Sequence, residues 1–225
     1  MIPWLRSDDP FPPVARALKS PNGLLCAGGD LSPERLVDAY CHGIFPWYSE
    51  GDPILWWSPN PRMVLFPGEL KVSRSLRKAV ARGTFEIRFD HAFVRVIEAC
   101  AEPREGQAGT WIVPEMAAAY TSLHVRGLAH SVEAWQDGEL VGGLYGLALG
   151  DAFFGESMFA RATDASKVAL VALVERLRAA GCRVVDCQQA TPHLASLGAR
   201  EIPRAAFVHL LQESIQYPPT GSRWT

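Results

Sequence analysis

Residues 129–188 read AHSVEAWQDGELVGGLYGLALGDAFFGESMFARATDASKVALVALVERLRAAGCRVVDCQ, and this stretch decides the fold. Three of its segments are rich in β-branched, aromatic and other apolar residues, which predicts strands at 129–135, 140–149 and 152–159. Asp137-Gly138 lies between the first two segments and is typical of a tight hairpin turn. We therefore expect antiparallel strands here.

An apolar helix and a further strand follow. Residues 164–180 carry apolar side chains at helical spacing, and Gly181 is placed to end the helix. Residues 183–188 then have the pattern of a short buried strand. Antiparallel strands, a crossover helix and another strand are an α+β order, so α+β is the predicted fold class.

The first 62 residues differ in composition. They are rich in proline, glycine and tryptophan, which rules out long regular elements. One helix is expected, with Ser32 as its N-cap, Pro33 at its first position and Gly43 after its end. We therefore expect a small loop-rich N-terminal domain over residues 1–62 and a second domain over residues 63–225.

Composition limits the classes of function. The net charge of −2 gives no global sign of a polyanion partner. The five cysteines are scattered without a C-x-x-C pair, which argues against disulfides and a structural zinc site and fits a cytoplasmic protein. No segment approaches the roughly 20 apolar residues that cross a membrane. The histidines lack metal-ligand spacing, and the serine hydrolase, P-loop and Rossmann signatures are absent. We expect neither metal nor cofactor.

Three polar residues lie within the apolar strand segments. Because side chains alternate along a strand, Asp186 and Gln188 are predicted to point to the same side, about 6.6 Å apart. Glu156 lies in the preceding predicted strand. A carboxylate in such surroundings is desolvated, paired or used in chemistry. The alternative to a catalytic role is a buried charge paired with Lys167 or Arg161.

Two further features have both a structural and a functional interpretation. The apolar stripe of the helix over 164–180 is either plain core or one wall of an apolar pocket. The segment from Arg62 to Arg82 holds six basic residues and one acidic residue. A basic face of this kind is either solvated or covered by a phosphate backbone. A short helix is expected from Arg74 to about Arg82, with Ser73 as its N-cap and with Leu76 and Val80 facing inward. The basic residues on this helix are Arg74, Arg77, Lys78 and Arg82.

Trp47 and Trp111 lie in loop-like or boundary contexts. Such tryptophans are either buried in a core or exposed, where they stack on unpaired bases.

Motifs in order along nearly the whole chain resemble those of the leucyl/phenylalanyl-tRNA–protein transferases. They are NGLL (22–25), GGDLSP (28–33), GIFPW (43–47), WWSP (56–59), SRSL (73–76), TWI (110–112), AHSVE (129–133), LVGGLYG (140–146), GESMF (155–159), DCQ (186–188) and SLGA (196–199). The resemblance implies a C-terminal domain of the GNAT acyltransferase fold. It also implies that Leu or Phe, and less well Met, passes from aminoacyl-tRNA to proteins with N-terminal Arg or Lys, which marks them for degradation.

The resemblance also implies roles for residues. The counterparts of Trp47 and Trp111 contact the terminal adenosine of the tRNA, and the basic helix contacts its body. The reaction centre is formed by Glu156, Asp186 and Gln188. The aminoacyl side-chain pocket is expected to comprise Leu144, Phe153, Gly155, Met158, Leu170, Leu173, Leu177 and Val185. Leu173 and Leu177 stand where bulkier aromatic residues occur in the family, which bears on the width of the pocket.

Chemistry suggests how these groups act. An α-amine attacks an ester that is already activated, so the enzyme needs orientation and proton management more than covalent catalysis. A nearby carboxylate is one group that can hold the amine and accept its proton. Asp186 is the candidate base, and Gln188 orients the amine. Glu156 shares the proton or attracts the basic side chain of the acceptor. A substrate-assisted route through the ribose hydroxyl of the tRNA stays open.

Two rival functions remain. The first is a GNAT acetyltransferase that uses acetyl-CoA. Residues 161–167 lack the glycine that lets backbone N–H groups approach a pyrophosphate, which argues against it. The second is an RNA-binding module, which leaves the three polar residues of the reaction centre unexplained. A monomer is expected.

Overall fold

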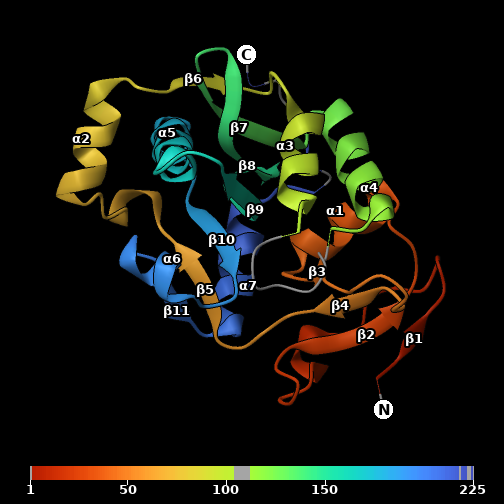
Figure 1. The fold of residues 1–225 in the computed structure, drawn as a ribbon. Helices are drawn as coiled ribbons and strands as arrows, with labels where there is room; N and C mark the ends of the chain where they lie inside the picture. The colour runs from red at the N-terminus through yellow and green to blue at the C-terminus, as the bar shows by residue number, and fades with distance from the viewer. Residues whose placement is uncertain (1, 104–111, 218, 222–223, 225) are drawn as a thin grey trace.

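The computed structural model describes residues 2–103, 112–217, 219–221 and 224 (Figure 1). Within them, the N-terminal part forms a four-stranded sheet with the order β1-β2-β4-β3. Its strands are short, as the density of proline and glycine predicts. They are β1 (Trp4–Leu5), β2 (Leu24–Gly28), β3 (Phe45–Pro46) and β4 (Leu55–Trp57).

The second sheet has seven strands in the order β11-β5-β10-β9-β8-β7-β6. Its strands are β5 (Arg62–Leu65), β6 (Glu86–Phe89), β7 (Ala129–Gln136), β8 (Glu139–Leu149), β9 (Ala152–Ala160), β10 (Val184–Gln188) and β11 (Arg200–Ile202). The hairpin between β7 and β8 is confirmed, with Asp137 and Gly138 both at positive φ. The crossover helix α5 (Ala165–Ala179) leads from β9 to β10, which pair in parallel. The predicted α+β class is therefore confirmed.

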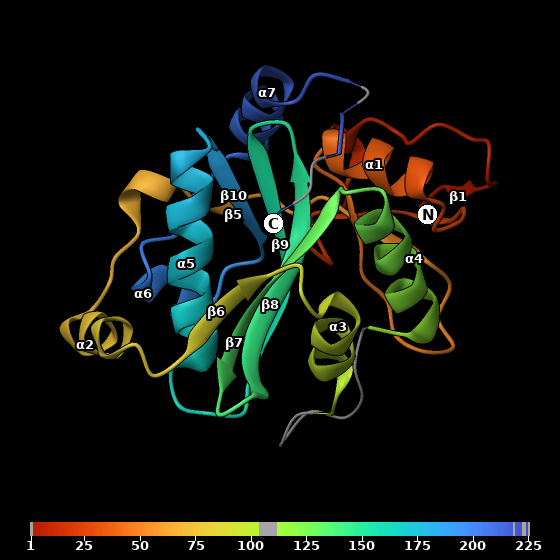
Figure 2. The same cartoon turned by 90° about the horizontal axis from the view of Figure 1, so that it is seen from above.

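Helices cover both faces of the large sheet (Figure 2). On one face lies α5, with α2 (Arg74–Arg82) packed against it on the outside. On the other face lie α3 (Phe93–Ala101) and α4 (Pro114–Val125), and α1 (Pro33–Cys41) packs against α4. The last two helices, α6 (Pro192–Ser196) and α7 (Arg204–Ser214), follow β10.

The two faces carry two apolar cores. The core on the side of α3 and α4 includes residues from both sides of position 62, such as Tyr40 and Trp56 with Phe154. The core on the side of α5 includes Phe153 and Leu173. The N-terminal sheet is thus joined to the rest of the chain through a shared apolar interior.

The helix starts follow the capping signals in the sequence. The hydroxyls of Ser32 and Ser73 accept hydrogen bonds from the backbone N–H groups of Arg35 and Leu76, so both N-caps are confirmed. Leu76 of α2 is buried as expected, but the expectation that Val80 also points inward is wrong, because 36% of it is exposed.

Two β-bulges disturb the large sheet where the polar residues lie. Tyr145 pairs with Ser157 and Gly146 with Gly155, which leaves Glu156 as the extra residue of β9. Asp186 pairs with Val64 and Gln188 with Met63, which leaves Cys187 as the extra residue of β10. Strict alternation of side chains therefore fails at both positions.

None of the helices in the described parts of the chain is long and apolar enough to cross a membrane.

Candidate functional site

A cavity of about 420 Å³ opens beside the point where β9 and β10 stop pairing. The last paired residues are Phe154 and Asp186, and both strands continue beyond them. Seven of the eight predicted pocket residues line this cavity: Leu144, Phe153, Gly155, Met158, Leu170, Leu173 and Val185. The eighth, Leu177, is buried in the same core but does not reach the cavity, so its assignment to the lining is corrected.

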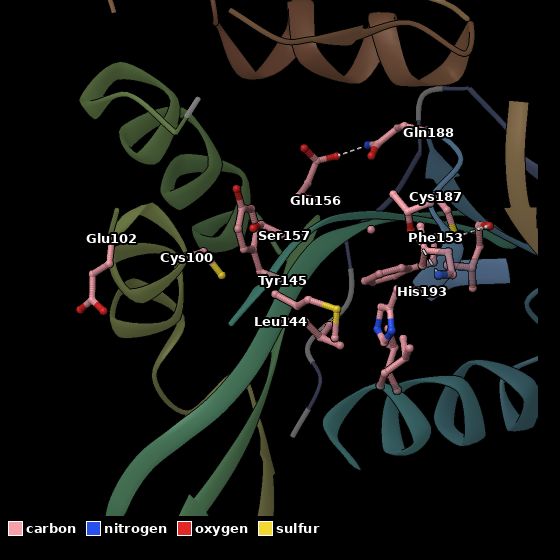
Figure 3. Close-up of a pocket in the computed structure, with 17 residues that line it drawn as sticks. Cys100, Glu102, Leu144, Tyr145, Phe153, Glu156, Ser157, Cys187, Gln188 and His193 are labelled. Atoms are coloured by element: carbon pink, nitrogen blue, oxygen red, sulfur yellow. Dashed lines mark hydrogen bonds between the residues drawn. The ribbon is translucent and has the colours of Figure 1, made fainter. Parts of the chain in front are cut away.

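Glu156 and Gln188 meet at one end of the cavity (Figure 3). Gln188 Nε2 donates to Glu156 Oε1 at 2.9 Å, while Leu144, Phe153 and His193 line the other end. One end of the cavity is therefore polar and the other largely apolar. This is the pattern of a pocket that holds an apolar side chain next to a reacting polar group.

Two tyrosines hold the carboxylate of Glu156 from the far side. Tyr40 donates to Glu156 Oε1 at 2.8 Å, and Tyr120 donates to Oε2 at 3.0 Å. The two phenolic oxygens lie 2.5 Å apart, and both side chains are fully buried. Burial raises the pKa of Glu156 to about 7, although the hydrogen bonds from Tyr40, Tyr120 and Gln188 lower it. Glu156 is therefore able both to accept and to release a proton near neutral pH.

Asp186 lies outside the cavity, in a dry ion pair. Arg62 donates to it twice, from Nε to Oδ1 at 2.8 Å and from Nη2 to Oδ2 at 2.7 Å, and both side chains are fully buried. Arg62 also donates to the carbonyl oxygen of Gly43 at 3.0 Å and lies between the rings of Phe45 and Phe207. The guanidinium is thus bound on several sides.

The same ion pair holds the bulge that carries Gln188. The backbone N–H of Gln188 donates to Asp186 Oδ1 at 2.9 Å, and the backbone φ of Gln188 is +57°. That left-handed conformation is unfavourable for a residue with a side chain, so neighbouring contacts must hold it. It turns Gln188 toward Glu156, whereas Asp186 stays beneath the cavity.

This arrangement corrects two expectations about Asp186. Its partner is Arg62 rather than Lys167 or Arg161, which pair instead with Asp164 and Glu102. A carboxylate with no exposed surface and with hydrogen bonds from a guanidinium and a backbone N–H does not contact an amine in the cavity. Glu156 and Gln188 do face the cavity, as expected.

Three functional candidates were missed at the level of the sequence. Tyr40 and Tyr120 lie at apolar positions of helices, so their pattern is that of ordinary core residues. Arg62 was counted with the basic segment that ends at Arg82, but it points into the interior. The sequence feature that could have identified Arg62 as a buried residue is its position at the start of an apolar segment, because a buried charge needs a partner.

The predicted tRNA-contacting tryptophans have different outcomes. Trp47 is 39% exposed, and its ring lies edge-on to that of Trp57 at 5.5 Å. An exposed indole held by a second ring is available for stacking. Trp111 lies outside the described residues.

The basic side chains of α2 all point to solvent. Within the described part of the chain, none of Arg74, Arg77, Lys78 and Arg82 forms a salt bridge with a carboxylate. Arg74, Lys78 and Arg82 follow one another at intervals of four residues, so like charges stack along the helix with no local compensation.

Groups of three or more His, Cys, Asp or Glu residues arranged to hold a metal ion do not occur among the described residues.

Comparisons with known proteins identify the family to which the sequence is similar. Residues 64–212 match the family model described as leucyl/phenylalanyl-tRNA protein transferase, and residues 29–60 match the model for the N-terminal domain of the same family. A leucyl/phenylalanyl-tRNA–protein transferase from Nitrosomonas eutropha is 62% identical over 224 residues, covering 100% of this chain and 96% of the relative. One from Stutzerimonas stutzeri is 62% identical over 219 residues, with 97% of each protein covered.

Similarity to solved structures is remote. A GCN5-related N-acetyltransferase from Kribbella flavida has a TM-score of 0.41 at 12% identity, covering 73% of this chain and 58% of that one. The C-terminal domain of a putative lysylphosphatidylglycerol synthetase from Agrobacterium fabrum has a TM-score of 0.43 at 12% identity, covering 81% and 69%.

Proposed function

The chain belongs to the leucyl/phenylalanyl-tRNA–protein transferase family, and from that membership we propose that its cavity receives the aminoacyl group and passes it to an acceptor amine. The enzyme is an aminoacyltransferase that moves Leu or Phe from aminoacyl-tRNA to the N-terminus of a protein. The observation that supports this role for the cavity is its division into an apolar end and a polar end with Glu156 and Gln188.

The reaction needs placement and proton transfer. The α-amine of the acceptor attacks the carbonyl carbon of the aminoacyl ester, a C–N bond forms, and the bond to the ribose oxygen breaks. One proton leaves the amine and one reaches the departing ribose oxygen. Because the ester is already activated, orientation of the two substrates supplies much of the acceleration.

Glu156 is the group in this proposal that takes the proton from the amine. Its carboxylate faces the cavity, and its pKa near 7 matches an exchange of protons at neutral pH. The oxygen of the Gln188 amide accepts an N–H bond from the amine, while its NH₂ group stays on Glu156. Asp186 acts through Gln188 as a positioning residue. The ribose hydroxyl remains the alternative carrier of the proton to the leaving oxygen.

The contacts with the tRNA are assigned from the family resemblance. We place the terminal adenosine of the tRNA on Trp47 together with Trp111, and the phosphate backbone over Arg74, Arg77, Lys78 and Arg82. The exposed, uncompensated charges of α2 support the second assignment.

Several finer features belong to the same proposal. Met is a weaker donor than Leu or Phe, and the acceptors carry an N-terminal Arg or Lys. The product is a degradation signal with a bulky apolar N-terminus. The enzyme works in the cytoplasm as a monomer without metal or cofactor. The chain divides into a small domain over residues 1–62 and a transfer domain over residues 63–225.

A transfer assay tests the proposal. Labelled Leu-tRNA, Phe-tRNA and Met-tRNA are each incubated with peptides that differ only in an N-terminal Arg, Lys or Asp. We expect label on the Arg and Lys peptides, with Leu and Phe ahead of Met, and none on the Asp peptide. Equal labelling of all three peptides would contradict the acceptor assignment, and absence of label from every peptide would contradict the function.

A further inference from the structure

Trp224 packs behind the apolar wall of the cavity. It is 7% exposed and lies in the same core as the lining residues Phe153, Leu170 and Leu173, but it does not line the cavity itself. Its ring centroid is 5.8 Å from that of Phe153, with 27° between the two planes. The indole therefore supports a lining residue from outside the cavity.

The ring of Phe153 has little space to move within the sheet. Its side chain is fully buried, and a Cβ built on Gly146 would come within 2.6 Å of its ring atoms. The ring thus lies against the backbone of β8 at Gly146 and cannot sink further into the sheet. The space into which it would otherwise move is filled by the indole of Trp224.

Trp224 is itself held by contacts remote from the cavity. Its ring stacks on His130 at 4.2 Å with 6° between the planes, and the guanidinium of Arg176 lies 5.0 Å from it. Its backbone N–H donates to Asp90 Oδ2 at 3.3 Å, the same oxygen that lies 2.7 Å from His130 Nδ1. These partners position the indole independently of any bound substrate.

We propose that Trp224 is a specificity-determining residue, which sets the depth of the aminoacyl cavity through Phe153 and thereby the preference between Leu and Phe. The inference rests on the proposed function of the cavity. An apolar pocket distinguishes side chains by volume, and a difference the size of one methylene changes the rate ratio by roughly 10- to 200-fold. Removal of the indole leaves a void, Phe153 relaxes into it, and the cavity deepens toward the larger side chain.

The test compares Trp224→Ala and Trp224→Phe with Tyr217→Ala. Tyr217 is the matched control, because it is also an aromatic residue after α7 but is 65% exposed. The measurement is kcat/KM for Leu-tRNA and for Phe-tRNA with a peptide that starts with Arg. We expect Trp224→Ala to raise the Phe-to-Leu ratio of kcat/KM by about tenfold or more. Trp224→Phe should return the ratio most of the way to the wild-type value, and Tyr217→Ala should leave it unchanged.

Thermal unfolding of each variant is measured first. If Trp224→Ala does not fold, Trp224→Leu replaces it with the same expected direction. Equal losses for both donors, with an unchanged ratio, would show that Trp224 only stabilises the fold and would overturn the proposal. A wild-type enzyme that transfers neither amino acid would instead overturn the proposed function, so the two failures are distinguishable.

Discussion

Replacement of Arg62 by methionine is expected to destabilise the protein strongly, because it leaves Asp186 charged, buried and without its partner. The guanidinium makes two hydrogen bonds to Asp186 and one to Gly43, and both charged side chains have no exposed surface. Removal of one member of a buried ion pair costs about 3–5 kcal/mol. For a chain of this length, that corresponds to a fall in Tm of roughly 6–20 °C.

Arg183→Met is the matched control. Arg183 also forms an ion pair, with Glu213 at 2.9 Å, but both side chains are more than two-fifths exposed. A surface pair of this kind contributes about 0–1 kcal/mol. Urea unfolding at equilibrium, with a check that the m-value is unchanged, measures both variants. A decrease in the free energy of unfolding of less than about 1 kcal/mol in Arg62→Met would refute the inference that Arg62 and Asp186 form a desolvated pair in which each charge needs the other.

The double variant Arg62→Met/Asp186→Leu separates stability from positioning. Replacement of a buried ion pair by apolar residues is often neutral or stabilising, so most of the lost stability should return. Transfer activity should not return, because the backbone N–H of Gln188 has lost its acceptor. Recovery of full kcat by the double variant would mean that Gln188 needs no support from Asp186.

Three further expectations concern Glu156, the cavity wall and the basic helix. Because the pKa of Glu156 rises from 4.5 to about 7 on folding, the stability that this group contributes is complete below pH 4.5 and is lost as the pH rises through 7. Glu156→Gln should therefore have a higher free energy of unfolding than the wild type at pH 8 but not at pH 4. An equal difference at the two pH values in urea unfolding would contradict the raised pKa. Leu173→Phe should lower kcat/KM for Phe-tRNA more than kcat/KM for Leu-tRNA, whereas Arg178→Phe, at an exposed position of the same helix, should leave the ratio of the two values unchanged. Arg74→Ala/Lys78→Ala should weaken tRNA binding and reduce the slope of log K against log salt by about 2, and an unchanged slope would remove α2 from the tRNA site.

The helices and the longer strands were predictable because their local signals agree with the global structure. The Asp137-Gly138 turn, the caps at Ser32 and Ser73 and the apolar helix before Gly181 each specify one element, and each is found. Strands β1 to β6 and β11 were not predicted. Each has between two and five residues, which is too short for a clear alternation of apolar and polar side chains.

The family resemblance anticipated about half of the residues that line the cavity, but the polar geometry was not predictable. Regular alternation of side chains along a strand places Asp186 and Gln188 on the same side of the sheet. The bulge at Cys187 and the positive φ of Gln188 instead turn the two side chains in different directions. A bulge depends on how two strands pair, and that pairing is not encoded in either strand alone. The partner of Asp186 lies 124 residues away in sequence, so no local pattern could identify it.

The long-range ion pair also connects the N-terminal segment to the proposed reaction centre. Arg62 donates to the carbonyl oxygen of Gly43 and its guanidinium lies over the ring of Phe45, and Trp47 follows two residues later. On the other side, the same guanidinium holds Asp186, and Asp186 holds the backbone of Gln188. One buried cation therefore ties the segment proposed to seat the terminal adenosine to the amide proposed to seat the amine. Transfer from an activated ester depends on the distance between the bound adenosine and the bound amine, and an error of about 1 Å can lower the rate 100-fold. In this proposal, a rigid and desolvated ion pair between Arg62 and Asp186 contributes more to the reaction than a second base in the cavity would. The carboxylate of Asp186 therefore serves the arrangement of the site without contacting the substrate.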